Sequence, residues 1–150
     1  MTESPSSEAH PTAVELDRDE CLELLRTARI GRVVLSVGCL PVALPVGLAV
    51  RGDDVVFSAV AGSTTDASIA GEVVSVEVDE IDPVCHTGWS VLVTGVARLV
   101  TDEVESASVA RVLRPGAPGP HPPLIKVQST LISGWKLACC AAQKVDRRPA

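Results

Sequence analysis

One stretch, residues 72–102, constrains the fold more than any other part of the chain (EVVSVEVDEIDPVCHTGWSVLVTGVARLVTD). Apolar and polar residues alternate over residues 74–79, which is the period of a β-strand with one buried and one exposed face. Asp82-Pro83 and residues 86–88 have turn chemistry, and a β-branched, mostly apolar run then extends to residue 100. The stretch therefore predicts two long antiparallel strands joined by a short turn.

Composition and further apolar runs extend this sheet. The 150 residues include two Trp, one Phe and no Tyr, so the core must be built mainly from Val, Leu, Ile and Ala. Branched side chains of this kind pack well on a pleated sheet. Further strands are predicted over residues 33–37, 40–50, 55–59 and 124–137. Six strands with few helices indicate a mainly β fold, an antiparallel barrel flanked by short α-helices.

Pro41 and Pro45 lie inside the predicted strand 40–50. Proline has no backbone N–H to donate to a sheet, so this strand should lie at an edge or be bulged at both positions. Residues 38–39 and 51–54 predict tight turns on either side of it. The run 114–123 (RPGAPGPHPP) predicts an extended loop.

Two helices are predicted from their N-terminal residues. Asp17 and Glu20 have capping-box spacing for a helix over residues 16–28, and Asp102 and Glu105 repeat it for a helix that ends near residue 113. We expect the first helix to bury Cys21, Leu24, Leu25 and Ala28, and the second to bury Val104, Ala107, Val109 and Val112.

A third, shorter helix is predicted over residues 61–70, where Ser63 or Thr64 supplies an N-cap. A helix N-terminus that follows a strand and Gly62 presents free backbone N–H groups, to which a phosphate can bind. Any strand–loop–helix connection has this feature, so an ordinary capped helix is the alternative interpretation.

Charge and cysteine spacing argue against several classes of protein. A net charge of −6 and the scarcity of aromatic residues argue against nucleic-acid binding. No apolar run is long enough to span a membrane, and residues 1–11 lack the apolar core of a signal peptide, so we expect a cytoplasmic protein. The five cysteines have no metal-ligand spacing, and we expect each to be a small buried apolar residue.

Isolated polar residues do not combine into a hydrolytic or metal site. His86 lies in the predicted turn, where exposure is the expected state. Glu77 and Asp79 alternate onto the exposed face of their strand. No G-x-S-x-G motif occurs, which leaves hydrolase chemistry unsupported. A haem pocket with His86 or a cysteine as axial ligand is a further alternative.

Four stretches follow one another along the chain: LDRDECLELLRTARIGRVVLSVGCLPVALPV, DDVVFSAVAGS, EVVSVEVDEIDPVCHTGWSVLVTGVARLV and LIKVQSTLISGWKL. In this order they resemble the pyridoxamine 5′-phosphate oxidase-like family of flavin-binding split barrels, and GWSVLVTGVA with the preceding EVDEID is the most specific part. The resemblance implies a six-stranded antiparallel split barrel of the FMN-binding type over residues 15–138. Residues 1–14 then form an N-terminal tail, predicted to be disordered, and residues 139–150 a C-terminal tail.

The resemblance also implies where a cofactor binds. Members of this family are typically homodimers that bind FMN or the deazaflavin F420 in grooves between the subunits. By analogy, the isoalloxazine ring lies near Pro45, Val46, Gly47 and Leu48. The phosphate lies against Phe57, Ser58 and Ala59 and the turn of Gly62, Ser63, Thr64 and Thr65, while Trp89 and Ser90 lie near the groove.

The implied phosphate site departs from the family pattern. Its hydroxyl groups are present, but Ser58, Ala59 and Thr64 stand where the family usually has basic or other phosphate-binding residues. No Lys or Arg occurs between Arg51 and Arg98. A charge-assisted hydrogen bond contributes about 1.5–3 kcal/mol, so the loss of two such bonds would weaken phosphate binding by orders of magnitude.

A cation from the partner subunit could compensate, and Arg29, Arg32 and Lys126 are the residues available for this role. For the two arginines, a solvated junction between helix and strand is the simpler interpretation. The sequence therefore predicts a homodimeric, FMN- or F420-dependent oxidoreductase that acts on a small molecule. The alternative is a degenerate split-barrel homodimer that has lost flavin binding and serves as a binding or regulatory protein.

Overall fold

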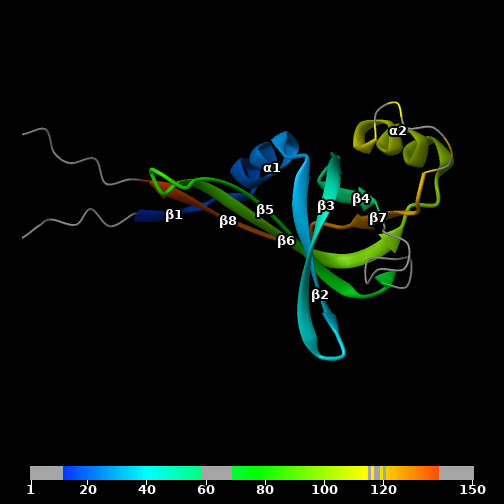
Figure 1. Cartoon of the computed structure of the whole chain (residues 1–150), viewed down its shortest axis with the longest axis horizontal. Helices are drawn as coiled ribbons and strands as arrows, with labels where there is room; N and C mark the ends of the chain where they lie inside the picture. The colour runs from blue at the N-terminus through cyan, green and yellow to red at the C-terminus, as the bar shows by residue number, and fades with distance from the viewer. Residues whose placement is uncertain (1–11, 59–68, 115, 117–118, 120, 139–150) are drawn as a thin grey trace, which may run out of the picture.

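A computed structural model defines the fold over residues 12–58, 69–114, 116, 119 and 121–138. Within these residues the chain forms eight strands and two helices (Figure 1). In chain order they are β1 (Thr12–Leu16), α1 (Arg18–Thr27), β2 (Ile30–Val37), β3 (Leu40–Arg51), β4 (Asp54–Ser58), β5 (Val73–Asp82), β6 (Thr87–Leu99), α2 (Glu103–Leu113), β7 (Leu124–Val127) and β8 (Leu131–Ala138).

The strands close into the predicted six-stranded antiparallel barrel. The order in the sheet is β1-β8-β6-β5-β2-β3-β4-β7, and β7 pairs in addition with β6, so that β2 to β7 form a closed ring. One edge of β6 pairs with β5, and the other edge is divided between β8 and β7. Figure 1 shows β1 and β8 extending from one end of the molecule and α2 at the other end.

The long hairpin of β5 and β6 forms as predicted, with ten residue pairs from Val73↔Val96 to Asp82↔Thr87. Its turn is stabilised by Asp82, whose Oδ1 accepts hydrogen bonds from the backbone N–H groups of Val84 at 2.7 Å and Cys85 at 3.0 Å. These two bonds favour the charged carboxylate and hold the pKa of Asp82 below its ordinary value.

The last predicted strand, residues 124–137, is wrong as a single element. β7 pairs with Ala97–Leu99 of β6, whereas β8 pairs with residues 88–94, so the chain crosses between two sections of the same edge. At the crossing the backbone of Gln128 lies against Gly95, where an added Cβ would be 1.8 Å from the Gln128 carbonyl oxygen. Apolar and polar residues alternate in both β7 and β8, so the alternation in the sequence does not show where one strand ends and the next begins.

β1 lies partly in the segment that the sequence assigns to the N-terminal tail. Thr12–Leu16 pairs with the final strand β8, from Thr12↔Ala138 to Leu16↔Gly134. A strand that pairs with the opposite end of the chain has little local signal, because its stability comes from a distant partner. The helix that follows begins at Arg18, two residues later than predicted.

The prediction of an edge at the two prolines is confirmed. Pro41 and Pro45 lie in the half of β3, residues 40–47, that pairs with β2 alone. The other half, residues 48–51, pairs with β4. Among the described residues the edge of β3 opposite β2 has no partner strand over residues 40–47, and the missing N–H groups of the prolines break no ladder there.

Helix α1 has the predicted capping box. The Asp17 side chain accepts from the Glu20 backbone N–H at 2.9 Å, and the Glu20 side chain accepts from the Asp17 N–H at the same distance. Cys21 and Leu25 are buried as predicted, Leu24 and Ala28 are only half-buried, and Leu22, which was not predicted, is buried. This face packs on the main core, in which Phe57 and the inward valines of β5 and β6 are fully enclosed.

The predicted apolar face of α2 is partly wrong. Val104 is 80% exposed and Ala107 is also exposed, whereas Ser106 and Val109 are buried. Val109 joins a second, smaller core cluster with Ala49, Val56 and Leu124. The helix is oriented by contact with β3 and β4, and this contact rotates Val104 toward solvent.

The prediction that the cysteines are buried is confirmed for Cys21 and wrong for Cys39 and Cys85. Cys39 and Cys85 are exposed because both lie in hairpin turns, Cys39 with a φ of 66°. Cys139 and Cys140 and most of the predicted helix 61–70 lie outside the described residues. Neither helix in the described part of the chain is long and apolar enough to cross a membrane. No group of three His, Cys, Asp or Glu side chains in that part could hold a metal ion.

Candidate functional site

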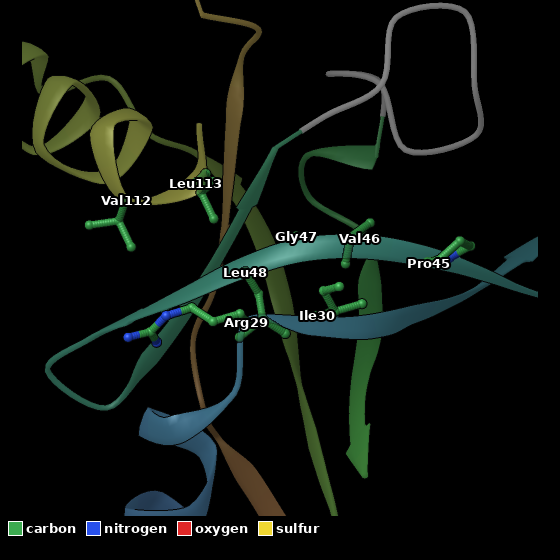
Figure 2. Close-up of a pocket in the computed structure, with 8 residues that line it drawn as sticks. All are labelled: Arg29, Ile30, Pro45, Val46, Gly47, Leu48, Val112 and Leu113. Carbon is green, nitrogen blue, oxygen red and sulfur yellow. The ribbon is translucent and has the colours of Figure 1, made fainter. Parts of the chain in front are cut away.

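A pocket of about 480 Å³ lies between the start of β2, the middle of β3 and the end of α2 (Figure 2). Its volume is in the range of small-molecule sites in proteins. The residues that line it are Arg29, Ile30, Pro45, Val46, Gly47, Leu48, Val112 and Leu113. The four residues that the resemblance assigns to the isoalloxazine ring therefore lie together in one pocket.

The β3 wall of this pocket carries little side chain, because Val46 and Leu48 are buried on the core side of the strand. Gly47 is opposite Ile30 in the β2–β3 ladder. A Cβ at Gly47 would meet only the Arg29 carbonyl oxygen, at 3.9 Å. Ile30 is 72% exposed beside it. An apolar side chain next to bare backbone is a suitable surface for one face of a planar ring.

Arg29 is the charged residue of the pocket lining. Its Nη1 donates hydrogen bonds to the carbonyl oxygens of Arg26 at 3.3 Å and Ala28 at 3.0 Å. Its own carbonyl oxygen accepts from the Leu48 N–H at 2.9 Å. Arg29 is thus joined both to the end of α1 and to β3, and Figure 2 shows its side chain and Pro45 at opposite ends of the labelled set.

The residues implied for the phosphate are only partly within the described chain. Phe57 is fully buried in the barrel core, so its ring faces away from solvent. Ser58 ends β4, is half-buried and pairs with Leu124. The remaining five residues lie outside the described ranges: Ala59, Gly62, Ser63, Thr64 and Thr65.

Trp89 and Ser90 do not line this pocket, and they point to opposite faces of β6. Trp89 packs against the main core. Ser90 Oγ donates to Glu77 Oε1 at 3.2 Å on the face that points away from the core. Within one chain, the structure therefore brings Pro45–Leu48 together but does not add these two residues to them.

The other two proposed cations are already paired with carboxylates. Arg32 Nη1 lies 2.8 Å from Asp79 Oδ1 and 3.1 Å from Glu77 Oε2. Hydrogen bonds to Asp79 and Glu77 raise the pKa of Arg32. Lys126 Nζ lies 2.5 Å from Glu105 Oε1. Glu77 and Asp79 lie on the exposed face as predicted, but they hold Arg32 rather than being only solvated.

Several apolar side chains surround this ion-pair cluster on the exposed side of the sheet. We call this surface the outer face, formed by the outward residues of β2, β5, β6 and β8. The strand registers place Leu92 beside Glu77, Trp135 beside Ser90, and Leu131 beside Thr94. Leu131 is 67% exposed and Trp135 is 49% exposed. Contiguous exposed apolar surface of this kind is typical of sites that contact another molecule.

The sequence prediction missed Ile30, Val112 and Leu113 as parts of the pocket. Ile30 could have been found from the hairpin register, since a turn at residues 38–39 places it opposite Gly47. No sequence signal was available for Val112 and Leu113, because α2 reaches the pocket only through its packing on β3 and β4. A second pocket, of about 400 Å³, is lined by the tip of β2 and the start of β5 and contains none of the predicted residues.

Comparison with known proteins gives consistent results. The family model described as pyridoxamine 5′-phosphate oxidase matches residues 17–138. The uncharacterized protein Rv0080 of Mycobacterium tuberculosis is 34% identical over 129 residues, which cover 83% of this chain and 85% of that protein.

Solved structures with the same fold include two flavoproteins. An FAD-binding protein from Mycobacterium smegmatis superposes with a TM-score of 0.63 at 27% identity, covering 83% of this chain and 98% of that one. An FAD-binding protein from Mesorhizobium loti superposes with a TM-score of 0.74 at 21% identity, covering 86% of this chain and 99% of that one, and supports the fold alone. By the match of its sequence over most of its length, and by its barrel, the chain belongs to the pyridoxamine 5′-phosphate oxidase family.

Proposed function

We propose that this protein binds a flavin-type cofactor and acts as an oxidoreductase on a small molecule. The observation that carries the proposal is the pocket at Pro45–Leu48, the same four residues that the family resemblance assigns to the isoalloxazine ring. The apolar surface of Ile30 and the open backbone at Gly47 suit a planar ring, and Arg29 suits an anion. The relative from Mycobacterium smegmatis, which binds FAD, supports the same class of ligand.

When bound, the flavin ring would supply the redox chemistry, and the protein would supply binding, orientation and electrostatics. Ile30 and Pro45, whose side chains are exposed, would contact the ring, whereas Val46 and Leu48 point their side chains into the core and would offer only backbone. Gly47 would let the ring approach the backbone of β3 closely. FMN, FAD and F420 all carry a ring system and at least one phosphate, so the pocket chemistry is compatible with each of the three.

We further propose that the protein is a homodimer in which the outer face is covered by a second copy. The support is the exposed apolar side chains around the Arg32 cluster and the edge of β3 over residues 40–47, which pairs with no other strand in the described part of the chain. The resemblance places Ser90 near the cofactor groove, and Ser90 lies on the outer face. A partner subunit that covers this face would therefore bring its own groove residues close to those of the first subunit. A stable dimer needs about 800 Å² from each partner, and an extended sheet face can supply that area.

Titration of the purified protein with FMN, FAD and F420, read by fluorescence, tests the proposed function. We expect saturable binding of one of the three at low micromolar concentration. A bound flavin that is reduced by a nicotinamide donor and reoxidised would support the oxidoreductase. If none of the three binds, the flavin proposal is wrong, and the degenerate dimer with a binding or regulatory role becomes the preferred function.

A further inference from the structure

The family resemblance implies a phosphate site at residues 62–65, and the sequence has no cation near these residues. No Lys or Arg occurs between Arg51 and Arg98, a range that includes β4 and the segment after it. A phosphate transferred from water into a protein site needs compensating charge or several hydrogen bonds. If the pocket binds a flavin nucleotide, a cation from another part of the fold has to face the anionic group.

Of the three cations considered, Arg29 is placed differently from the other two. Arg32 is bonded to Glu77 and Asp79, and Lys126 is bonded to Glu105. Arg29 has no carboxylate within 4.0 Å among the described residues, and it lines the pocket. Its charge is therefore available to a ligand without breaking an ion pair.

The guanidinium of Arg29 makes hydrogen bonds through one nitrogen, and in the described part of the chain its other two nitrogens are free to bind a ligand. Nη1 donates to the carbonyl oxygens of Arg26 and Ala28, which fixes the group against the end of α1. Nε and Nη2 have no partner in the described part of the chain. These two nitrogens form the planar fork that binds two oxygens of a phosphate at once.

The order of the residues along the pocket also suits a flavin nucleotide. Pro45 and Arg29 lie at opposite ends of the labelled residues in Figure 2, with Ile30, Val46, Gly47 and Leu48 between them. A ring placed over the apolar end would direct its ribityl phosphate toward the charged end. This arrangement needs no basic residue in β4 or in the segment that follows it.

We propose, on the basis of the proposed flavin function, that Arg29 of the same subunit binds the phosphate of the flavin nucleotide and replaces the missing family cations. Arg29 acts as an anion-binding residue, and it determines that the pocket prefers phosphorylated flavins over neutral ones. The link between α1 and β2, rather than β4, is then the part of this protein that recognises the phosphate.

The test compares each flavin with its phosphate-free form in three variants. Riboflavin is the neutral control for FMN and FAD, and the phosphate-free deazaflavin is the control for F420. We expect the wild type to bind the phosphorylated form about tenfold or more tightly than the neutral form. Arg29→Gln should remove this preference and leave binding of the neutral flavin unchanged, and Arg29→Lys should retain part of it, because an ammonium cannot form the bidentate contact.

Arg98→Gln is the matched control, because Arg98 is exposed on β6, lies outside the pocket lining and has no ion pair in the described residues. It removes the same charge and should not change the preference. Equal binding of phosphorylated and neutral flavin by the wild type, or an unchanged preference in Arg29→Gln, would overturn the inference and leave the flavin function standing.

A different result is expected if the flavin function itself is wrong. If the wild type binds no flavin, the role of Arg29 is tested by comparing the melting temperature of the protein with and without inorganic pyrophosphate. A rise in melting temperature that is lost in Arg29→Gln and kept in Arg98→Gln would support Arg29 as an anion-binding residue. No rise in the wild type would overturn both proposals. Arg29 is exposed, so its variants should fold, and circular dichroism would verify that they do.

Discussion

At the scale of single residues, two neighbouring glycines have opposite functions. Gly31 is buried, and a Cβ there would lie 2.7 Å from both the Glu77 carbonyl oxygen and Leu48 Cδ2. Gly47, on the adjacent strand, faces open space except for the Arg29 carbonyl oxygen. Gly31 therefore permits close packing of the barrel, whereas Gly47 leaves room for a ligand.

Gly47→Val should block the pocket without unfolding the protein. A valine here would project beside Ile30 into the space proposed for the ring, and it suits a strand position. We expect flavin affinity, measured by fluorescence titration, to fall about tenfold or more, with a melting temperature close to that of the wild type. Ala107→Val, at an exposed position of α2 outside this pocket and outside the outer face, is the control and should bind flavin normally. Normal binding by Gly47→Val would show that the ring binds elsewhere.

Asp82 should make the stability of the β5–β6 hairpin turn depend on pH. Its pKa in the folded protein is lowered, because the N–H groups of Cys85 and Val84 donate to the carboxylate. The stability it contributes is fully present above the ordinary aspartate pKa of about 3.9 and is lost as the pH falls through the lower, folded value. We expect the free energy of unfolding in urea to be higher for the wild type than for Asp82→Ala at pH 7. This difference should become smaller only as the pH is lowered toward 2.5. A constant difference over this range would contradict the assignment.

At the scale of elements, β6 organises the fold by exchanging partners along one edge. It pairs with β8 up to Thr94 and with β7 from Ala97. Arg18 of α1 stabilises the crossing, because its guanidinium donates to the carbonyl oxygen of Ser129 at 3.3 Å. The crossing chain can pass β6 closely because residue 95 has no side chain.

Gly95→Ala should therefore be strongly destabilising. The new Cβ would lie 1.8 Å from the Gln128 carbonyl oxygen, a backbone atom that cannot rotate away. We expect a loss of about 2 kcal/mol or more in the free energy of unfolding, measured by urea denaturation. Gly47→Ala is the matched control and should change stability by less than about 0.5 kcal/mol, because its Cβ has free space. Similar stability of both variants would rule out the close crossing.

At the scale of the whole molecule, the proposed dimer depends on the outer face. Leu92 lies near its centre, between Glu77 of β5 and Ser133 of β8. Its side chain is partly exposed in the single chain, so replacing it has little effect on the core of one subunit. In a dimer the same position would be buried, and a charge there would be desolvated beside Glu77.

Leu92→Asp should convert a dimer into a monomer. We expect the dissociation constant to rise about tenfold or more, measured by light scattering after size-exclusion chromatography over a range of concentrations. Val104→Asp adds the same charge at an exposed position of α2 and should leave the mass unchanged. A monomeric wild type at micromolar concentration, or a dimeric Leu92→Asp with unchanged affinity, would refute the outer-face dimer.

Local features of this protein were predictable because they depend on residues a few positions apart. The capping box at Asp17 and Glu20, the hairpin of β5 and β6, and the edge at Pro41 and Pro45 all follow from short-range backbone chemistry. The apolar face of α2 was predicted less well, since Val104 is turned outward by the contact with β3 and β4.

The sequence alone determined strands β2 to β6, the helix N-caps and the mainly β barrel, because periodicity and turn chemistry act within one element. Only the tertiary structure decided that β6 exchanges partners at Gly95 and that β1 pairs with β8. It also decided that Arg29, Gly47 and Leu113 share one pocket. These three residues lie on separate elements, and barrel closure with the packing of α2 on β3, rather than any local preference, brings them together.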